Sequence, residues 1–178
     1  MDRQINIRMA NVNDAEDIIS VMEKVSSNMP HADWFVAGGR EYIETHIDES
    51  GFIFLAEGIV ADERPELAGF FVVDFPGESE HNLGWDIGFD LEQCRRVVHM
   101  DTAVVAEGWR GLGLQHKLMQ ACEKELAHRG WEYLLATIHP DNIYSLNNAL
   151  KGGYQVMATK EKYGGKLRHI MMKTLPMK

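Results

Sequence analysis

The stretch that decides the fold is His99-Met-Asp-Thr-Ala-Val-Val-Ala-Glu-Gly-Trp-Arg-Gly-Leu-Gly-Leu-Gln115. Residues 97–106 are mostly apolar, as is typical of a buried strand. Glycines then recur at positions 108, 111 and 113, and an apolar stripe at helical spacing runs from Leu114 to Leu126. The stretch therefore predicts a strand, a glycine-rich turn and a helix, in that order.

The glycine-rich turn has the properties of an anion-binding site. Glycine has no Cβ, so the backbone amides of the turn can approach a ligand closely. The N-terminus of the following helix adds N–H groups without helical partners and a partial positive charge, which suit a phosphate or pyrophosphate. Arg110 adds a cation at the same rim. A tight turn that binds no ligand is the alternative.

Two common phosphate-binding motifs do not fit the turn. A Walker loop continues with Gly-Lys-Ser/Thr, but Gly113 is followed by Leu114 and Gln115. A dinucleotide-binding fingerprint needs a further glycine where His116 stands, and it belongs to the first β-α-β unit of a chain. The sequence therefore supports neither nucleoside triphosphate hydrolysis nor dinucleotide binding.

The remaining sequence alternates between strand and helix signals in an α/β order. A helix is expected from a capping box at Asn13 and Glu16 to Ser27. The segment 83–89 is either a strand or a loop, and Gly164-Gly165 marks a hairpin. A helix is also expected at 41–48, a short one at 142–152, and strands at 5–8, 52–57, 67–74, 133–138, 154–163 and 167–175.

Composition favours one soluble globular domain over residues 1–178, since 45% of the residues are hydrophobic and 25% are charged. A net charge of −9 argues against nucleic acid and favours cationic partners. No apolar run reaches the roughly 20 residues of a membrane helix, and the N-terminus lacks the apolar stretch of a signal peptide, so a cytoplasmic protein without membrane contact is expected. Two cysteines, Cys94 and Cys122, are too few for a disulfide framework or a thiolate zinc site, and no metal is expected.

The strand–turn–helix stretch resembles motif A of the GNAT superfamily of N-acetyltransferases, whose Arg/Gln-x-x-Gly-x-Gly/Ala loop holds the pyrophosphate of acetyl-CoA. The loop here reads Arg110-Gly-Leu-Gly-Leu-Gln115, with Gln115 where the family usually has Gly or Ala. The family's motif B resembles Asn142-Ile-Tyr-Ser145 leading to Gly153-Tyr154. The order of helices and strands along the whole chain also resembles the fold of this family. The resemblance implies a mixed, twisted α/β sheet flanked by helices, with acetyl-CoA bound where two parallel strands part.

The resemblance also implies which residues bind acetyl-CoA. The main chain of Val104, Val105 and Ala106 is expected to pair with the pantetheine arm, and Asn142 to reach it from the next helix. The pyrophosphate is expected to be wrapped by Arg110, Gly111, Leu112, Gly113, Leu114 and Gln115. The implied reaction is direct transfer of acetyl to a primary amine, without a covalent enzyme intermediate. A non-catalytic acyl-CoA-binding sensor or regulatory domain is the alternative.

The residues that transfer protons in such a reaction are a separate question. Many relatives carry a proton-donating tyrosine in the motif B helix, but Ala149 stands there, and Tyr144 one turn earlier is a candidate substitute. The bases of this family often lie on the motif A strand. His99 and Asp101 occupy that stretch and share one face at period two, and an imidazole is well matched to neutral pH. They are the candidate catalytic residues, with packed or structural roles as the alternative; Glu107 is a third candidate base.

Substrate selectivity is expected from the early helices, the segment 83–89 and the hairpin at 164–165. Carboxylates beside aromatic faces suit a cationic amine through charge and cation–π attraction. An amine acceptor, either a small molecule or a peptide, is therefore expected, and a homodimer is left open. The candidates for acceptor contact are Asp33, Trp34, Trp85, Asp86 and Tyr163.

Overall fold

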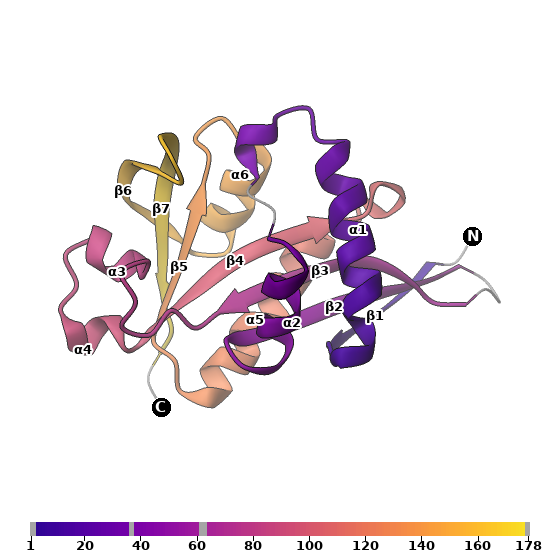
Figure 1. Cartoon of the computed structure of the whole chain (residues 1–178), viewed down its shortest axis with the longest axis horizontal. Coiled ribbons are helices and arrows are strands. Elements are labelled where there is room, and N and C mark those ends of the chain that lie inside the picture. Colours follow the sequence, from indigo (N-terminus) through magenta and orange to yellow (C-terminus); the bar gives the residue numbers. More distant parts are fainter. Residues whose placement is uncertain (1–2, 36–37, 61–63, 177–178) are drawn as a thin grey trace. The chain divides into compact units, whose positions relative to one another are not determined.

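The computed structural model describes residues 3–35, 38–60 and 64–176. Its strands form one mixed sheet of seven in the order β1-β2-β3-β4-β5-β7-β6, which confirms the expected α/β class (Figure 1). The strands are β1 Arg3–Met9, β2 Gly51–Val60, β3 Glu66–Asp74, β4 Val97–Val105, β5 Tyr133–Ile138, β6 Gln155–Lys162 and β7 Lys166–Thr174. The helices are α1 Ala15–Ser27, α2 Arg40–Asp48, α3 Leu83–Asp86, α4 Leu91–Cys94, α5 Leu114–Arg129 and α6 Ile143–Lys151, with single 3-10 turns η1 Val12–Asp14, η2 Ala32–Trp34 and η3 Glu107–Trp109.

The segment 83–89 begins as the short helix α3, so the strand considered for it is wrong. Asn82, which is 1% exposed, causes this by capping the helix: its Oδ1 accepts the N–H of Gly84 at 2.8 Å. Its Nδ2 donates to the carbonyls of Gly77 and Cys94 at 2.7 and 2.9 Å. A buried asparagine with all these bonds fixes a turn rather than an extended chain.

The first helix is capped two residues earlier than the sequence predicts. The side chain of Asn11 accepts the N–H of Asn13 at 3.0 Å, and Asp14 Oδ2 accepts the N–H of Asn11 at 2.8 Å. The capping box is therefore Asn11 and Asp14, and the turn η1 leads into α1. The expected box at Asn13 and Glu16 is wrong because Asn11 and Asp14 offer the same spacing two residues upstream.

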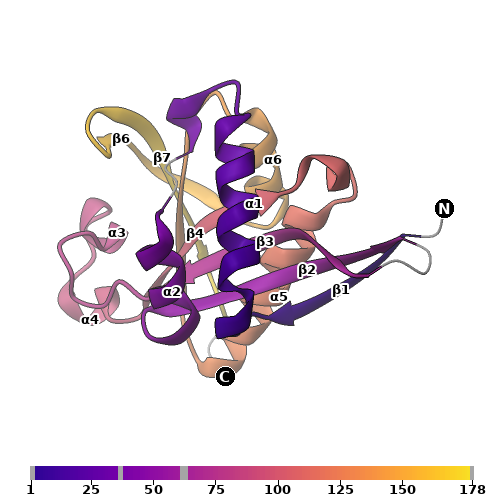
Figure 2. The same cartoon turned by 45° about the vertical axis from the view of Figure 1, so that its right-hand side comes forward.

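Contacts divide the chain into two compact units: unit 1 comprises residues 1–73 and 102–123, and unit 2 comprises residues 74–101 and 124–178. In unit 1, α1 and α2 cover one face of the strands β2 and β3 (Figure 2). Ile18 of α1, Ile43 of α2 and Phe70 of β3 are fully buried in this core, where each side chain stabilises the fold by about 1.5–3 kcal/mol.

An ion-pair network also lies in unit 1, between β1, β2 and η1. The guanidinium of Arg8 donates to both carboxylate oxygens of Asp14, at 2.7 and 2.8 Å, and to Glu57 at 2.8 Å. These hydrogen bonds lower the pKa of the Asp14 carboxyl from its ordinary value of 3.8 and that of Glu57 from 4.5. The side chains are partly shielded, with 35% of Arg8 and 14% of Asp14 exposed.

Replacing Arg8 by methionine is expected to remove a pH-dependent part of the stability. A depressed carboxyl pKa stabilises the fold above the unfolded pKa, and this stability is lost as the pH falls through the folded pKa. The difference in unfolding free energy between wild type and Arg8→Met should therefore be largest above about pH 5, and it should shrink as the pH falls to about 2. Urea unfolding across this range measures it. Arg40→Met, which breaks the exposed pair with Glu16, is the control and should change stability little at any pH.

Unit 2 contains the parallel pairing of β4 with β5 and the antiparallel pairs β5–β7 and β6–β7. Leu83, Val97, Leu135 and Ile170 form its core. The expected hairpin joins β6 to β7, and its turn contains Gly164 and Gly165, both at positive φ.

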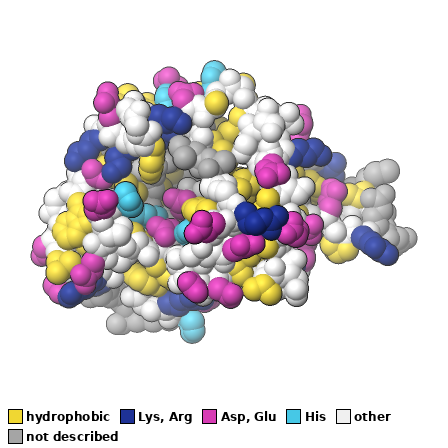
Figure 3. All heavy atoms as spheres, in the orientation of Figure 1, with side chains coloured by type: hydrophobic (Ala, Val, Ile, Leu, Met, Phe, Trp, Pro, Cys, Tyr) yellow, Lys and Arg dark blue, Asp and Glu magenta, His cyan; other side chains and the backbone are white. Residues whose placement is uncertain are grey.

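Acidic side chains are spread over the face of the molecule that Figure 3 shows, in keeping with the net charge of −9.

The parallel pairing of β4 with β5 is short. Its register joins Val97 to Tyr133 and ends where His99 faces Leu135. Both strands run on past this point, β4 to Val105 and β5 to Ile138. Asp101 and Thr137 thus follow the last pair by two residues each, one on either strand. The expected parting of two parallel strands is present here.

Candidate active site

The glycine-rich turn in unit 1 begins directly after β4. The N–H of Ala106 still donates to the carbonyl of Ala68 at 2.9 Å, which extends the strand by one residue. The turn η3 follows, and then Gly111 and Gly113 adopt φ values of +81° and +69°. Residues other than glycine rarely adopt this left-handed backbone conformation, so these two glycines allow the chain to turn from β4 into α5.

The turn and the start of α5 together form an open cradle. The first helical bond of α5 runs from Lys117 N–H to the carbonyl of Gly113, so the amides of the first turn have no acceptor within the helix. No atom lies within 4 Å of the place that a Cβ would take at Gly111 or Gly113. Arg110 is exposed at the rim. Open space, helix amides and a cation fit a pyrophosphate group.

Two leucines of the predicted cradle contribute differently. Leu114 is 2% exposed and its side chain belongs to the protein interior, whereas Leu112 is 38% exposed. Upstream, Val104 is 2% exposed and Val105 and Ala106 are half-buried. The side chains of Val104 and Leu114 thus have packing roles, and the ligand contacts expected of these residues are main-chain contacts. Those contacts stay predictions.

Trp109 anchors the cradle to the rest of unit 1. Its ring is 3% exposed, and its Nε1–H donates to Glu66 Oε1 at 2.5 Å. The guanidinium of Arg3 lies 5.0 Å from the ring centroid and donates to the carbonyl of Gly108 at 3.0 Å. The ring rests on Gly58 of β2, where a Cβ would be 2.3 Å from it. Sequence reasoning missed this anchor, because its partners are far apart in the chain.

Substituting Gly58 is expected to displace this anchor. Because a Cβ at position 58 would overlap the Trp109 ring, Gly58→Ala should lower the unfolding free energy by about 1–3 kcal/mol, the usual cost of overpacking. It should also shift the emission of Trp109 to longer wavelength as the ring becomes exposed. Urea unfolding followed by fluorescence measures both. Gly108→Ala, in the same turn but with no atom near the position of a Cβ, should change neither the unfolding free energy nor the emission wavelength. Equal effects of the two substitutions would show that Trp109 does not pack closely against Gly58.

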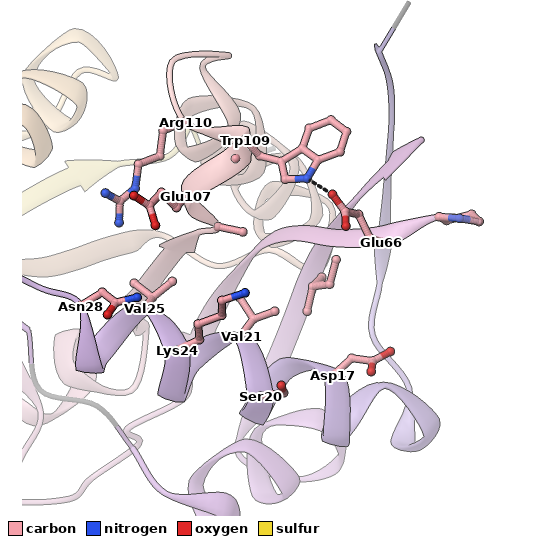
Figure 4. Close-up of a pocket in the computed structure, with 14 residues that line it drawn as sticks. Asp17, Ser20, Val21, Lys24, Val25, Asn28, Glu66, Glu107, Trp109 and Arg110 are labelled. Carbon is pink, nitrogen blue, oxygen red and sulfur yellow. Dashed lines mark hydrogen bonds between the residues drawn. The ribbon is translucent and has the colours of Figure 1, made fainter. Parts of the chain in front are cut away.

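A groove of about 690 Å³ lies between α1 and the turn, within unit 1 (Figure 4). Lys24 and Arg110 bring cations to it, and Asp17, Glu66 and Glu107 bring carboxylates. Glu107, the third candidate base, is exposed and lines this groove. The mixed charge suits a polar ligand group.

His99, in unit 2, is buried at 7% exposure and both its ring nitrogens have partners. Its Nε2 accepts the N–H of Leu83 at 3.0 Å, so the proton of the neutral ring is on Nδ1, which lies 3.0 Å from Asp74 Oδ2. Asp74 therefore holds this tautomer of His99. A proton can be taken up at Nε2 only if the bond from Leu83 is broken.

Asp101 lies two residues further along β4 and is exposed. The phenol of Tyr163 is near enough to respond to its charge. Desolvation raises the pKa of Tyr163 above its ordinary value of 10, and the carboxylate of Asp101 raises it further. The hydroxyl of Tyr163 lies 3.1 Å from Thr137 Oγ1. Unit 2 thus brings together residues of β4, β5 and the β6–β7 turn.

The motif B helix α6 begins with a cap at Asn142. Its Oδ1 accepts the N–H of Ser145 at 3.2 Å, so this side chain shapes the helix start, and its contact with the pantetheine arm stays a prediction. Ala149 is 6% exposed and packs inward, whereas Tyr144 is 63% exposed. No phenol therefore stands at the usual place of the proton donor on α6.

Several residues expected to contact an acceptor are engaged with other groups. The carboxylate of Asp86 receives Lys162 Nζ at 2.6 Å, and its main-chain carbonyl receives Lys160 Nζ at 2.6 Å. Trp85 Nε1–H donates to the carbonyl of Ser79 at 2.9 Å, and the ring of Trp34 stacks on that of His31 with centroids 4.2 Å apart. Asp33 lies exposed in η2. Asp86 is thus neutralised by the protein's own lysines.

A mixed sheet with parting parallel strands and a glycine-rich anion cradle after one of them defines an acetyltransferase-type fold. The sequence model of the acetyltransferase (GNAT) family matches residues 19–154, and the chain belongs to this family. No helix in the part of the chain that the structure describes is long and apolar enough to cross a membrane.

Solved structures share the fold at low sequence identity. NAA60 of Arabidopsis thaliana in complex with acetyl-CoA has 15% identity and a TM-score of 0.74, over 97% of this chain and 99% of that one. The ribosomal-protein-S18-alanine N-acetyltransferase of Escherichia coli has 14% identity and a TM-score of 0.70, over 98% and 96%. An acetyltransferase of the GNAT family from Streptococcus pneumoniae has 15% identity and a TM-score of 0.70, over 97% of this chain and 100% of that one. A comparison with curated protein sequences gives no significant match.

Proposed function

We propose that the chain is a single N-acetyltransferase domain that transfers acetyl from acetyl-CoA to a primary amine by direct attack. The observation that carries this proposal is the cradle of Gly111, Gly113 and the α5 N-terminus in a member of the GNAT family. The space beside both glycines is open, so a phosphate oxygen can reach the backbone amides. The structure of NAA60 with acetyl-CoA supports the choice of co-substrate by analogy of fold.

In this proposal the cradle binds and orients acetyl-CoA. The amides of Gly111 to Gln115 and the guanidinium of Arg110 hold the pyrophosphate, and the main chain of Val104 to Ala106 pairs with the pantetheine arm. Asn142 approaches the same arm from α6. When bound, acetyl-CoA supplies an activated acetyl group whose carbon–sulfur bond breaks as the amine nitrogen attacks.

We place base function on the His99 and Asp101 face of β4. An alkylammonium has a pKa of about 10 and must lose a proton before it attacks. Asp101 is exposed and able to contact the amine directly or through one water, whereas the lone pair of His99 already accepts the N–H of Leu83. Asp101 therefore takes the proton, and His99 is a positioning residue that ties β4 to Asp74 and α3.

No general acid is assigned on α6, since Ala149 occupies the usual position. CoA thiolate is a tolerable leaving group and can take its proton from solvent. The same alanine favours the second candidate function, a sensor domain that binds acetyl-CoA without turning it over.

Two measurements on the intact protein test the proposal. Calorimetry with acetyl-CoA should show binding, and a thiol-release assay with a panel of primary amines, amino acids and peptides should show CoA formation that depends on the amine. Binding without CoA release from any amine would support the sensor. Absence of acetyl-CoA binding would overturn both functions.

A further inference from the structure

Two buried side chains bracket the exposed residues 111–113 of the cradle. Trp109 precedes them at 3% exposure, and Leu114 follows them at 2%. Both glycines between these side chains have positive φ, at +81° and +69°, and glycine has more backbone freedom than any other residue. The position of the cradle amides therefore depends on how firmly the two flanking side chains are held.

Trp109 is held from three strands of unit 1. Its ring lies against Gly58 of β2, and its Nε1–H donates to the carboxylate of Glu66 of β3 at 2.5 Å. The guanidinium of Arg3, on β1, lies 5.0 Å from the ring centroid. A cation over the ring face and a carboxylate at the N–H both complement the charge distribution of an indole. The two charged contacts therefore fix the orientation of the ring.

Arg3 also holds the main chain beside the ring, because its Nη1 donates to the carbonyl of Gly108 at 3.0 Å. A guanidinium is planar and has five N–H donors, so it can lie on an aromatic ring and bond to a carbonyl at the same time. Arg3 is itself exposed and begins the edge strand β1. An exposed residue at a strand end can thus order the turn while adding little to the stability of the fold.

We propose that Arg3 is a positioning residue that sets the affinity for acetyl-CoA by holding Trp109 and Gly108 in place. This inference rests on the proposed function and adds to it a residue of β1, outside the cradle. In the free protein, Arg3 keeps the turn in the conformation that binds the pyrophosphate. Without Arg3 the turn populates other conformations, and the apparent Kd rises in inverse proportion to the population that can bind.

Arg3→Met is expected to raise the Kd for acetyl-CoA about tenfold, the effect of a turn that adopts the binding conformation about a tenth of the time. The KM for acetyl-CoA should rise with it, whereas kcat and the KM for the amine should not change, because the turn acts on binding and not on the chemical step. Arg3→Lys keeps the charge and a donor, so it should retain most of the affinity. Calorimetry with acetyl-CoA measures Kd, and the thiol-release assay gives the kinetic constants.

Arg40→Met is the matched control. Arg40 is also an exposed arginine of unit 1, but it lies on α2 and pairs with Glu16, so its removal changes the net charge equally without touching the turn. If Arg3 acts only through long-range attraction of an anionic ligand, both substitutions should weaken binding equally. If Arg3 acts through the turn, Arg40→Met should bind acetyl-CoA as the wild type does. Urea unfolding should give both variants a stability close to that of the wild type.

The order of the turn can be measured without turnover, from the NMR exchange of the Trp109 indole N–H with water. This exchange should be slow in the wild type, because the ring is buried and the N–H is bonded to Glu66. Arg3→Met should speed it, and saturating CoA, which carries the pyrophosphate but no acetyl group, should slow it again. Trp109→Phe identifies the signal among those of the four tryptophans. The indole of Trp131, which stacks on Phe75 in unit 2, should not respond.

The outcomes separate this inference from the proposed function. If the wild type binds acetyl-CoA and Arg3→Met binds it equally tightly, the inference fails and the proposed function stands. Equal losses of affinity in Arg3→Met and Arg40→Met, or faster exchange of every indole signal in Arg3→Met, would also overturn the inference alone. If the wild type does not bind acetyl-CoA, the proposed function and this inference fail together.

Discussion

Gly113→Val is expected to weaken the binding of acetyl-CoA by about a hundredfold or more. The backbone at position 113 has a φ of +69°, a region that costs a residue with a Cβ about 1–2 kcal/mol. The valine side chain would also fill the open space beside the helix N-terminus, where each lost hydrogen bond to a phosphate oxygen is worth about 1.5–3 kcal/mol. The two effects act on the same ligand contact.

The control for this substitution lies at the opposite end of α5. Gly130 also has positive φ, at +85°, and also has no atom within 4 Å of a Cβ position. Gly130→Val should therefore suffer the same backbone strain but retain its affinity for acetyl-CoA. Calorimetry measures affinity and urea unfolding measures stability for both variants. If both bind acetyl-CoA as tightly as the wild type, the cradle is not the pyrophosphate site.

The features that the sequence predicted well are local ones. The turn from β4 into α5 depends on glycines within a few residues of each other, and both Gly111 and Gly113 adopt the left-handed backbone that only such residues favour. The hairpin glycines Gly164 and Gly165 are a second case. In each, the residue type and its immediate neighbours determine the backbone, so spacing alone is enough to predict the structure.

The features that could not be predicted depend on distant partners. Asp86 looked like an acceptor-binding carboxylate, yet its partners Lys160 and Lys162 are 74 and 76 positions away in the sequence. His99 looked like a base, and its partners Asp74 and the N–H of Leu83 lie on other elements. Neither case carries a signal in the spacing of residues, because the sheet order brings the partners together only after folding.

A second limit concerns competing local signals. Asn11 and Asn13 both precede a helix at capping distance from an acidic residue, and the structure uses Asn11 with Asp14. The pattern at 83–89 is apolar enough for a strand, but Asn82 starts a helix because its buried side chain forms hydrogen bonds with three backbone groups. The choice in both places rests on hydrogen bonds that the pattern of apolar residues does not describe.

The roles of the two candidate catalytic residues can be separated by one pair of conservative substitutions. Asp101→Asn is expected to lower turnover by about a hundredfold or more, the scale of a lost general base. His99→Gln should keep turnover within about tenfold, because the amide can donate to Asp74 and accept the N–H of Leu83 as the imidazole does. His99→Ala should instead destabilise the protein by about 1–3 kcal/mol, since it leaves those buried groups without a partner.

The pH dependence of turnover distinguishes a base from a positioning residue. If His99 only holds β4 in place, the acidic limb of the rate–pH profile should be the same in His99→Gln as in the wild type, since glutamine does not titrate. The limb should be lost in Asp101→Asn. The reverse result, with the limb lost in folded His99→Gln and kept in Asp101→Asn, would mean that Nε2 releases Leu83 during the reaction and takes the proton itself. In that case the short helix α3, which begins at Leu83, must move in each catalytic cycle. The Asp86–Lys162 ion pair, which holds α3 in place, would then influence the turnover rate.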